Sequence, residues 1–282
     1  MDIVALVVPC YNEAERLRPE VFLGALRAFP WLRMVLVDDG SRDTTRKKLE
    51  HLASCERDRV SVVALPANVG KAEAVRQGLH RAMQERPSYV GYWDADLATP
   101  FEALPDFMRV FELQPHADIV IGSRVRLLGR DIQRSAARHY TGRVFATMAS
   151  LVLGIPVYDT QCGAKVLRSG PWLERVLSRP FGSRWIFDVE LLARYLDDRH
   201  GPGEHAPSGD RIYELALRSW IDEPGSKVRA KDGLRAAADL FRIYRARSRR
   251  PEERASAALD SARLTVDAAV PNSARTDRST RT

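Results

Sequence analysis

The chain has 282 residues, of which 45% are hydrophobic, and this excludes a fibrous or wholly disordered protein. Its three cysteines are odd in number and widely spaced, which indicates neither a disulfide framework nor a zinc site and favours a cytoplasmic protein. Residues 226–282 hold 14 Lys and Arg against 7 Asp and Glu, which accounts for the net charge of +7. The rest of the chain is neutral, so we expect no nucleic-acid-binding surface.

No segment is expected to span a membrane. The longest uncharged stretch, between Arg143 and Asp159, has 15 residues, fewer than the ~20 of a spanning helix. The chain also starts without the basic region of a signal peptide.

Short apolar runs alternate with amphipathic segments over the first half of the chain. Strands are predicted at residues 3–8, 34–37, 60–65, 89–93 and 118–121. Helices are predicted to begin near residues 43, 71 and 100. This alternation predicts an α/β fold whose mainly parallel, Rossmann-like sheet is flanked by helices.

The second half is predicted to be mostly helical. Helices are expected at 134–153, from 171 and at 187–195, followed by a loop at 200–210 and a returning strand at 211–217. Residues 251–282, rich in Ala, Ser, Arg, Asp and Thr, are predicted to be a disordered tail. The predicted division is therefore a domain over 1–225, a basic amphipathic helix over 226–250, and this tail.

Asp94-Ala95-Asp96 follows a predicted buried strand, at the sheet edge where such folds bind ligands. Side chains at positions i and i+2 of an extended segment point the same way, so the two carboxylates converge. Convergent carboxylates suit Mg²⁺ or Mn²⁺, which also binds diphosphate oxygens. A solvated acidic turn is the alternative, and the other polar strand ends nearby favour the metal site.

Two further strand ends carry candidate binding residues. Asp39 can accept hydrogen bonds from a nucleobase or a ribose, although its Asp-Gly sequence is equally typical of a plain turn. Lys71 follows a glycine at a helix start and can meet a phosphate there. A solvated lysine is the alternative for Lys71.

The motifs at these strand ends resemble those of glycosyltransferase family 2. They are residues 8–13 (VPCYNE), 37–41 (VDDGS), 68–71 (NVGK) and 94–96 (DAD). Later motifs resemble the branch of dolichyl-phosphate glucosyltransferases and polyprenyl-phosphate glycosyltransferases. They are residues 122–124 (GSR), 134–135 (RS), 159–163 (DTQCG), 187–191 (FDVEL) and 224–228 (PGSKV). The resemblance covers roughly residues 3–245.

This resemblance implies a GT-A fold and an inverting, metal-dependent transfer of a sugar from a nucleotide donor. UDP-glucose is the favoured donor and a polyprenyl or dolichyl phosphate the favoured acceptor. The implied donor-binding residues are Pro9, Tyr11, Glu13, Asp39, Lys71, Asp94, Ala95 and Asp96. The implied metal ligands are Asp94, Asp96 and Asp188, and Asp96 and Asp188 also count as catalytic. A helix-start carboxylate stabilised by the helix dipole is an equal alternative for Asp188.

Three arginines are candidates for holding the acceptor. A phosphate monoester is already anionic at neutral pH, so it needs cationic positioning and no base. Arg124 ends a strand, and Arg134 and Arg138 lie one helical turn apart, in the region where the resembling family receives the lipid phosphate. Asp159 is a candidate for orienting the acceptor or acting as a base, with a structural loop carboxylate as the alternative.

The segment 226–250 has an apolar stripe at helical spacing among nine basic and two acidic residues. The stripe consists of Leu234, Ala237, Ala238, Phe241 and Tyr244. Such a helix can bind peripherally to an anionic membrane at its inner face, or it can dock on the domain by this stripe. The sequence leaves both possibilities open.

Three other functions remain as alternatives. One is a glycosyltransferase acting on a soluble small molecule. A sugar-nucleotide pyrophosphorylase is disfavoured because residues 9–13 stand where those enzymes carry a Gly-rich phosphate loop. A non-catalytic protein at a membrane surface is opposed by the presence of Asp39, Asp94 and Asp96.

Overall fold

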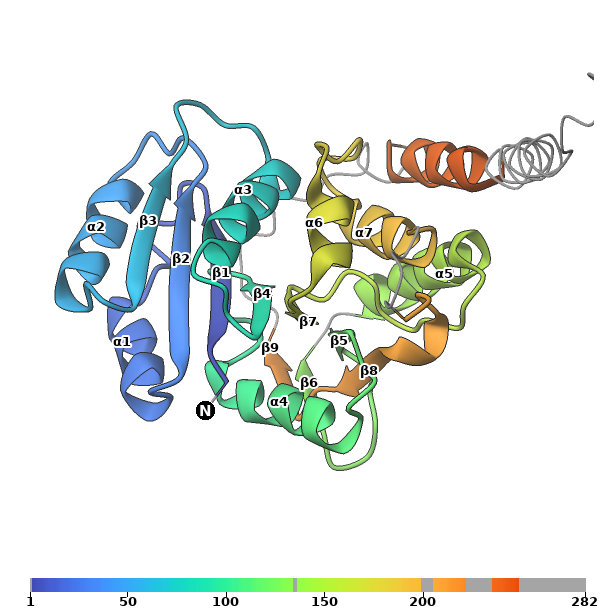
Figure 1. The fold of residues 1–282 in the computed structure, drawn as a ribbon, viewed down its shortest axis with the longest axis horizontal. Helices are drawn as coiled ribbons and strands as arrows, with labels where there is room; N and C mark the ends of the chain where they lie inside the picture. The colour runs from blue at the N-terminus through green and yellow to red at the C-terminus, as the bar shows by residue number, and fades with distance from the viewer. Residues whose placement is uncertain (1, 134–135, 199–204, 222–234, 249–282) are drawn as a thin grey trace, which may run out of the picture.

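The computed structural model describes residues 2–133, 136–198, 205–221 and 235–248 (Figure 1), with side chains in the 136–153 helix described from residue 140. A central mixed sheet has helices on both faces. The predicted α/β class and the mainly parallel sheet are confirmed.

The central sheet has seven strands in the order β3-β2-β1-β4-β7-β5-β8. They are β1 Val4–Cys10, β2 Leu32–Asp38, β3 Val60–Ala64, β4 Tyr89–Trp93, β5 Ile119–Ser123, β7 Ala164–Arg168 and β8 Ile212–Ala216. All neighbours pair in parallel except β7, which runs antiparallel between β4 and β5. The five predicted strands and the returning strand are confirmed, whereas β7 was not predicted because Lys165 interrupts its apolar run.

Helices and short strands complete the fold. The helices are α1 Pro19–Ala28, α2 Thr45–Cys55, α3 Lys71–Met83, α4 Leu104–Leu113, α5 Ala136–Leu153, α6 Pro171–Leu177 and α7 Phe187–Leu196, with 3-10 turns at Phe101–Ala103 and Gly209–Arg211. Strands β6 Asp131–Gln133 and β9 Ser219–Ile221 form a second, two-stranded parallel sheet. The predicted helices are confirmed. Helix α1 was not predicted, because Arg18 at its N-cap is not one of the residue types that usually cap a helix.

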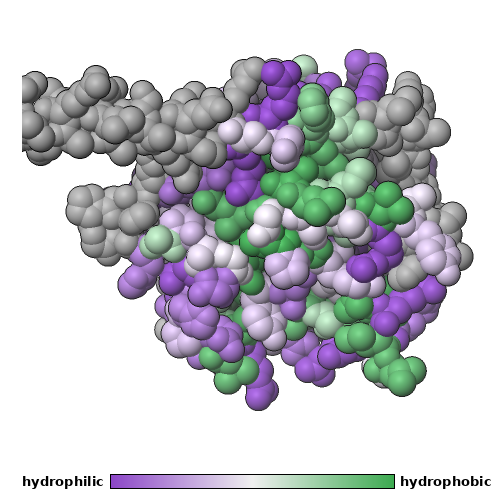
Figure 2. All heavy atoms as spheres, turned by 90° about the vertical axis from the view of Figure 1, so that its right-hand side faces the viewer, coloured by the Kyte–Doolittle hydropathy of each residue, from purple (hydrophilic) through white to green (hydrophobic). Residues whose placement is uncertain are grey.

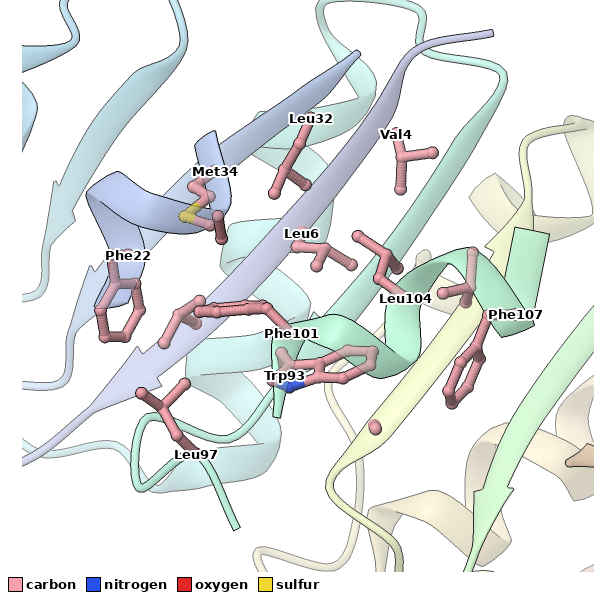
Figure 3. Packing of buried hydrophobic residues seen from close by; sticks show 14 of the residues in the cluster. Val4, Leu6, Phe22, Leu32, Met34, Trp93, Leu97, Phe101, Leu104 and Phe107 are labelled. Carbon is pink, nitrogen blue, oxygen red and sulfur yellow. The ribbon is translucent and has the colours of Figure 1, made fainter. Parts of the chain in front are cut away.

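The core consists of two hydrophobic layers, one on each face of the sheet. Along β1, Leu6 faces the layer under α1, α2 and α4, and Val7 faces the layer under α3, α5, α6 and α7, as the two-residue period of a strand requires. Trp93 packs between Phe101 and Phe107 in the first layer (Figure 3). This packing holds the last residue of β4 in place, and the acidic pair follows directly after that strand.

Residues 235–248 form a helix that docks on the domain by a face other than the predicted stripe. Leu240 and Ile243 are buried in the second core layer, whereas Phe241 and Tyr244 are 61% and 50% exposed. Docking by the predicted stripe, one of the two possibilities for this segment, is therefore wrong, because Ile243, which is not part of that stripe, packs inward.

Polar contacts fix this C-terminal helix in place. Arg247 pairs with Asp197 at 3.3 Å and donates to the backbone oxygen of Val152 in α5 at 3.0 Å. Asp239 accepts a hydrogen bond from Ser183 at 2.5 Å. Residues 226–234 and the predicted tail at 251–282 lie outside the described residues. None of the described helices is long and apolar enough to cross a membrane.

Candidate active site

Asp39, at the end of β2, organises the loop that precedes α3. Its Oδ1 accepts from the backbone N–H of Val69 at 2.8 Å, and its Oδ2 accepts from the N–H of Gly70 at 3.0 Å and the side-chain amide of Asn68 at 2.8 Å. Burial raises the pKa of Asp39, although these N–H groups oppose the shift. Each carboxylate oxygen has two acceptor positions, so Asp39 keeps capacity for a further donor.

The loop after β1 is hydrogen-bonded to the loop after β2 and to the start of α2. Glu13 donates its backbone N–H to the Thr45 hydroxyl at 2.8 Å, and its side chain pairs with Arg16 at 2.6 Å. Pro9, near the end of β1, and Tyr11, in the loop that follows, are half-buried. The structure therefore places these predicted donor-binding residues beside Asp39, as parallel neighbouring strands require.

Asp94 and Lys71 meet across the gap between β4 and α3. The Lys71 Nζ lies 2.6 Å from the Asp94 Oδ1 at the start of α3. Burial lowers the pKa of Lys71, but Asp94, Asp188 and Asp96 outweigh it, so that its pKa is raised. The ammonium group is thus held charged at the helix N-terminus, where phosphate oxygens are favoured.

Asp96 is the second carboxylate of the acidic pair, and Ala95 between them is buried. Burial and the negative charge of Asp94 raise the pKa of Asp96. Two carboxylates that repel each other in this way are stabilised by a divalent cation, and Mg²⁺ is commonly held by one or two carboxylates together with substrate phosphates. The pair therefore fits a metal–diphosphate complex.

Asp188, the third proposed metal ligand, lies at the start of α7 and is only 5% exposed. The fully buried Lys165 donates to its Oδ1 at 2.7 Å and to the backbone oxygen of Cys162 at 2.7 Å, and the Tyr92 hydroxyl also donates to Oδ1. Among the described residues, no three metal-ligating side chains form a cluster. Asp188 is therefore a buried ion-pair partner next to the acidic pair.

Gly163 lets the segment 159–163 approach the acidic pair closely. Its backbone oxygen accepts from the Asp94 N–H at 2.9 Å. A Cβ at this position would lie 2.0 Å from the Asp94 Oδ2, a distance that would displace the carboxylate. The segment 159–163 therefore connects the acidic pair directly to the region of Asp159.

Arg124 and Asp159, predicted separately, form one ion pair. The Arg124 Nε and Nη2 donate to the two Asp159 oxygens at 2.6 and 2.7 Å. The guanidinium also lies 5.3 Å above the Trp220 ring. On β8, Glu214 accepts the backbone N–H groups of Tyr158 and Asp159 at 2.7 Å each. This network fixes Asp159 and orients Arg124.

A hollow opens beside this pair, between α5 and the segment 158–161. Its lining includes Arg124, Arg143, Tyr158 and Thr160. The Arg143 guanidinium stacks over the Tyr158 ring at 3.8 Å. The buried Thr160 hydroxyl has no hydrogen-bond partner among the described residues. The Asp159 carboxylate also lines the hollow and pairs with Arg124, so the Arg143 guanidinium and the unsatisfied hydroxyl are the groups best suited to a phosphate there.

Two of the predicted acceptor residues cannot be placed in this hollow. Arg134 lies outside the described residues, and Arg138 belongs to α5 at a position whose side chain is not described. Arg143 was not predicted as a site residue, because a basic residue in a helix is most often solvated. The one sequence feature that distinguishes Arg143 from other basic residues is its position directly before the uncharged stretch 144–158.

Arg184 is a further residue that the sequence did not single out. Its Nη2 donates to the Asn68 side chain at 3.0 Å, and its charge opposes the rise in the pKa of Asp39. The loop between α6 and α7 thus brings a cation close to Asp39, which is more than a hundred residues away in the chain.

Comparisons with known proteins point to one family. A family model described as Glycosyl transferase family 2 matches residues 5–171. The dolichyl-phosphate beta-glucosyltransferase of Drosophila melanogaster is 31% identical over 86% of this chain and 74% of its own length. The enzyme of that name from Mus musculus is 34% identical, and the match covers 67% of this chain and 61% of the mouse protein.

A solved structure supports the fold. Glucosyl-3-phosphoglycerate synthase of Mycobacterium tuberculosis superposes with a TM-score of 0.62 at 15% identity, covering 87% of this chain and 80% of that chain. The same enzyme has been crystallised with Mn²⁺, UDP-glucose and phosphoglyceric acid. At this identity the likeness concerns the fold alone.

Proposed function

Because this chain belongs to glycosyl transferase family 2, we propose that it transfers glucose from UDP-glucose to a polyprenyl phosphate. The observation that carries the proposal is the connection, through the segment 159–163, between the Asp94–Asp96 pair and the hollow lined by Arg124 and Arg143. The proposed diphosphate site and the proposed acceptor-phosphate site would thereby be adjacent.

The donor assignment rests on Asp39, Lys71 and the acidic pair. Asp39 would accept from the ribose or the base, and Lys71 would meet the diphosphate at the start of α3. Asp94 and Asp96 would hold Mg²⁺ or Mn²⁺, which neutralises the charge that develops on the leaving diphosphate. The names of the curated relatives favour glucose as the sugar.

The acceptor assignment rests on the hollow. An oxygen of the acceptor phosphate forms a bond to the anomeric carbon as the bond from that carbon to the UDP oxygen breaks, which inverts the carbon. Since the phosphate is already anionic, no protein base is needed. Arg143 and Arg124 would orient it, and Asp159 would act by fixing Arg124.

The first prediction concerns nucleotide preference. In the presence of Mn²⁺, UDP should raise the melting temperature of the protein more than GDP does, because a ligand that binds only the folded state stabilises it. Differential scanning fluorimetry measures this directly. Stronger protection by GDP would contradict the uridine donor, and no protection by any nucleotide would contradict the glycosyl-donor site.

The second prediction concerns Arg143. Substitution Arg143→Gln should lower kcat/KM for polyprenyl phosphate by roughly ten- to a hundredfold, since a charge-assisted hydrogen bond contributes about 1.5–3 kcal/mol. Arg143→Lys should restore part of the loss because lysine lacks the planar fork. Arg143 is a better choice for substitution than Arg124, because removing Arg124 would also break its ion pair with Asp159.

The control for this experiment is Arg109→Gln, which removes the same charge from an exposed position on α4. It should leave kcat/KM unchanged, and both variants should retain UDP binding. An Arg143→Gln enzyme with unaltered kcat/KM would contradict the phosphate assignment. Assays with phosphoglyceric acid beside polyprenyl phosphate separate a soluble acceptor from a lipid one.

A further inference from the structure

Helix α5 exposes a row of large apolar side chains to solvent. Tyr140, Val144, Met148 and Leu151 are 71%, 62%, 38% and 76% exposed. Their spacing of four, four and three residues places them on one face of the helix. We call these four residues the α5 stripe.

The α5 stripe is accompanied by one charged residue, the exposed Arg143, whose guanidinium stacks over the Tyr158 ring. Residues 144–158 contain no Asp, Glu, Lys or Arg. The opposite face of α5 is occupied, since Ala146, Ala149 and Leu153 are buried in the core. A helix on the surface of a globular protein normally turns a mainly polar and charged face to water, whereas α5 exposes four large apolar side chains there.

The surface around the stripe joins apolar and basic residues. Hydrophobic residues gather on the side of the molecule where α5 lies (Figure 2). The C-terminal helix is tied to α5 by the bond from Arg247 to the Val152 oxygen. It exposes Phe241, and Arg245 lies 5.9 Å from that ring.

The stripe also lies next to the proposed acceptor site. Arg143, Phe145 and Ala146 of α5 line the hollow that contains Arg124. Val144, between them in sequence, points away from the domain and is exposed. A phosphate held in the hollow would therefore have any attached apolar chain beside the stripe.

We propose that the α5 stripe inserts into the headgroup region of an anionic membrane, with the basic C-terminal helix contacting the headgroups. Burial of apolar side chains and attraction of basic ones act together in this mode of binding. A second copy of the chain is the weaker occupant, because an isologous contact would bring two C-terminal segments of like charge together. The inference rests on the proposed lipid acceptor, which would then reach the hollow without leaving the membrane.

The test is co-sedimentation of the full chain with vesicles of phosphatidylcholine containing phosphatidylglycerol, without donor or acceptor. The variant Val144→Gln/Leu151→Gln keeps every charge and alters only exposed positions, so it should fold normally. Its vesicle affinity should fall at least about tenfold, because burying one leucine-sized side chain corresponds to about that factor. The control Leu113→Gln changes a 66% exposed leucine on α4 and should bind like the wild type.

Each possible result either supports or contradicts the proposed membrane contact. Equal vesicle binding by the double variant and the wild type overturns the proposal, as does a wild type that does not bind. A wild-type dimer in size-exclusion chromatography that the double variant abolishes would assign the stripe to a second copy. UDP binding by the same samples reports on the proposed function separately, so vesicle binding without sugar transfer would overturn the function and leave the membrane surface standing.

Discussion

Asp96→Asn should lower kcat/KM for sugar transfer at least about a hundredfold, because it removes a negative charge from the proposed metal site, where the cation contributes several kcal/mol. The fold should be unaffected. The Asp96 Oδ1 accepts the N–H of Ala98 at 3.1 Å, and the amide oxygen of asparagine can keep that bond. Glu112→Gln, an exposed position on α4, removes the same charge and is the control.

Removal of the metal is the independent arm of this experiment. EDTA should inactivate the wild type, and Mn²⁺ or Mg²⁺ should restore it. Since the pKa of Asp96 is raised by burial and by Asp94, protons should displace the metal at a higher pH than at an ordinary aspartate. Isothermal titration with Mn²⁺ and UDP measures this, and full activity in chelator would contradict the metal site.

Lys165→Met should destabilise the protein more than any surface substitution, by about 3–5 kcal/mol. Lys165 is fully buried on β7, and its loss leaves the Asp188 carboxylate buried without its cation. Urea denaturation followed by circular dichroism measures the free energy of unfolding. The effect is a consequence of burial, since an exposed ion pair would contribute only about 0–1 kcal/mol.

The double variant Lys165→Met/Asp188→Asn is the matched control. It removes both charges and keeps an acceptor for the Tyr92 hydroxyl, so it should recover most of the lost stability. The single variant Asp188→Asn should also be destabilised, because Lys165 would then be buried without a partner. If Asp188→Asn has the same free energy of unfolding as the wild type, the Lys165–Asp188 ion pair does not stabilise the fold and this prediction is contradicted.

The sequence by itself determined the elements whose signals are local. β1, β2, β4 and the helices α2, α3 and α4 are continuous apolar or amphipathic runs, and such patterns depend only on neighbouring residues. The approach of Asp39 to the acidic pair also followed from sequence, because parallel strands bring their carboxyl ends to one edge. The family resemblance placed the remaining motifs in order along the chain.

Only the tertiary structure decided the features that depend on distant partners. β7 could be recognised once Asp188, 23 residues away, was seen to neutralise Lys165 in the core. The docking face of the C-terminal helix was decided by the packing of Leu240 and Ile243 against the second core layer, which the helical periodicity of the sequence does not reveal. Arg143 joined the site because α5 packs beside the segment 158–161. Contacts between residues far apart in the chain bury these charges and apolar side chains, and a local pattern carries no record of them.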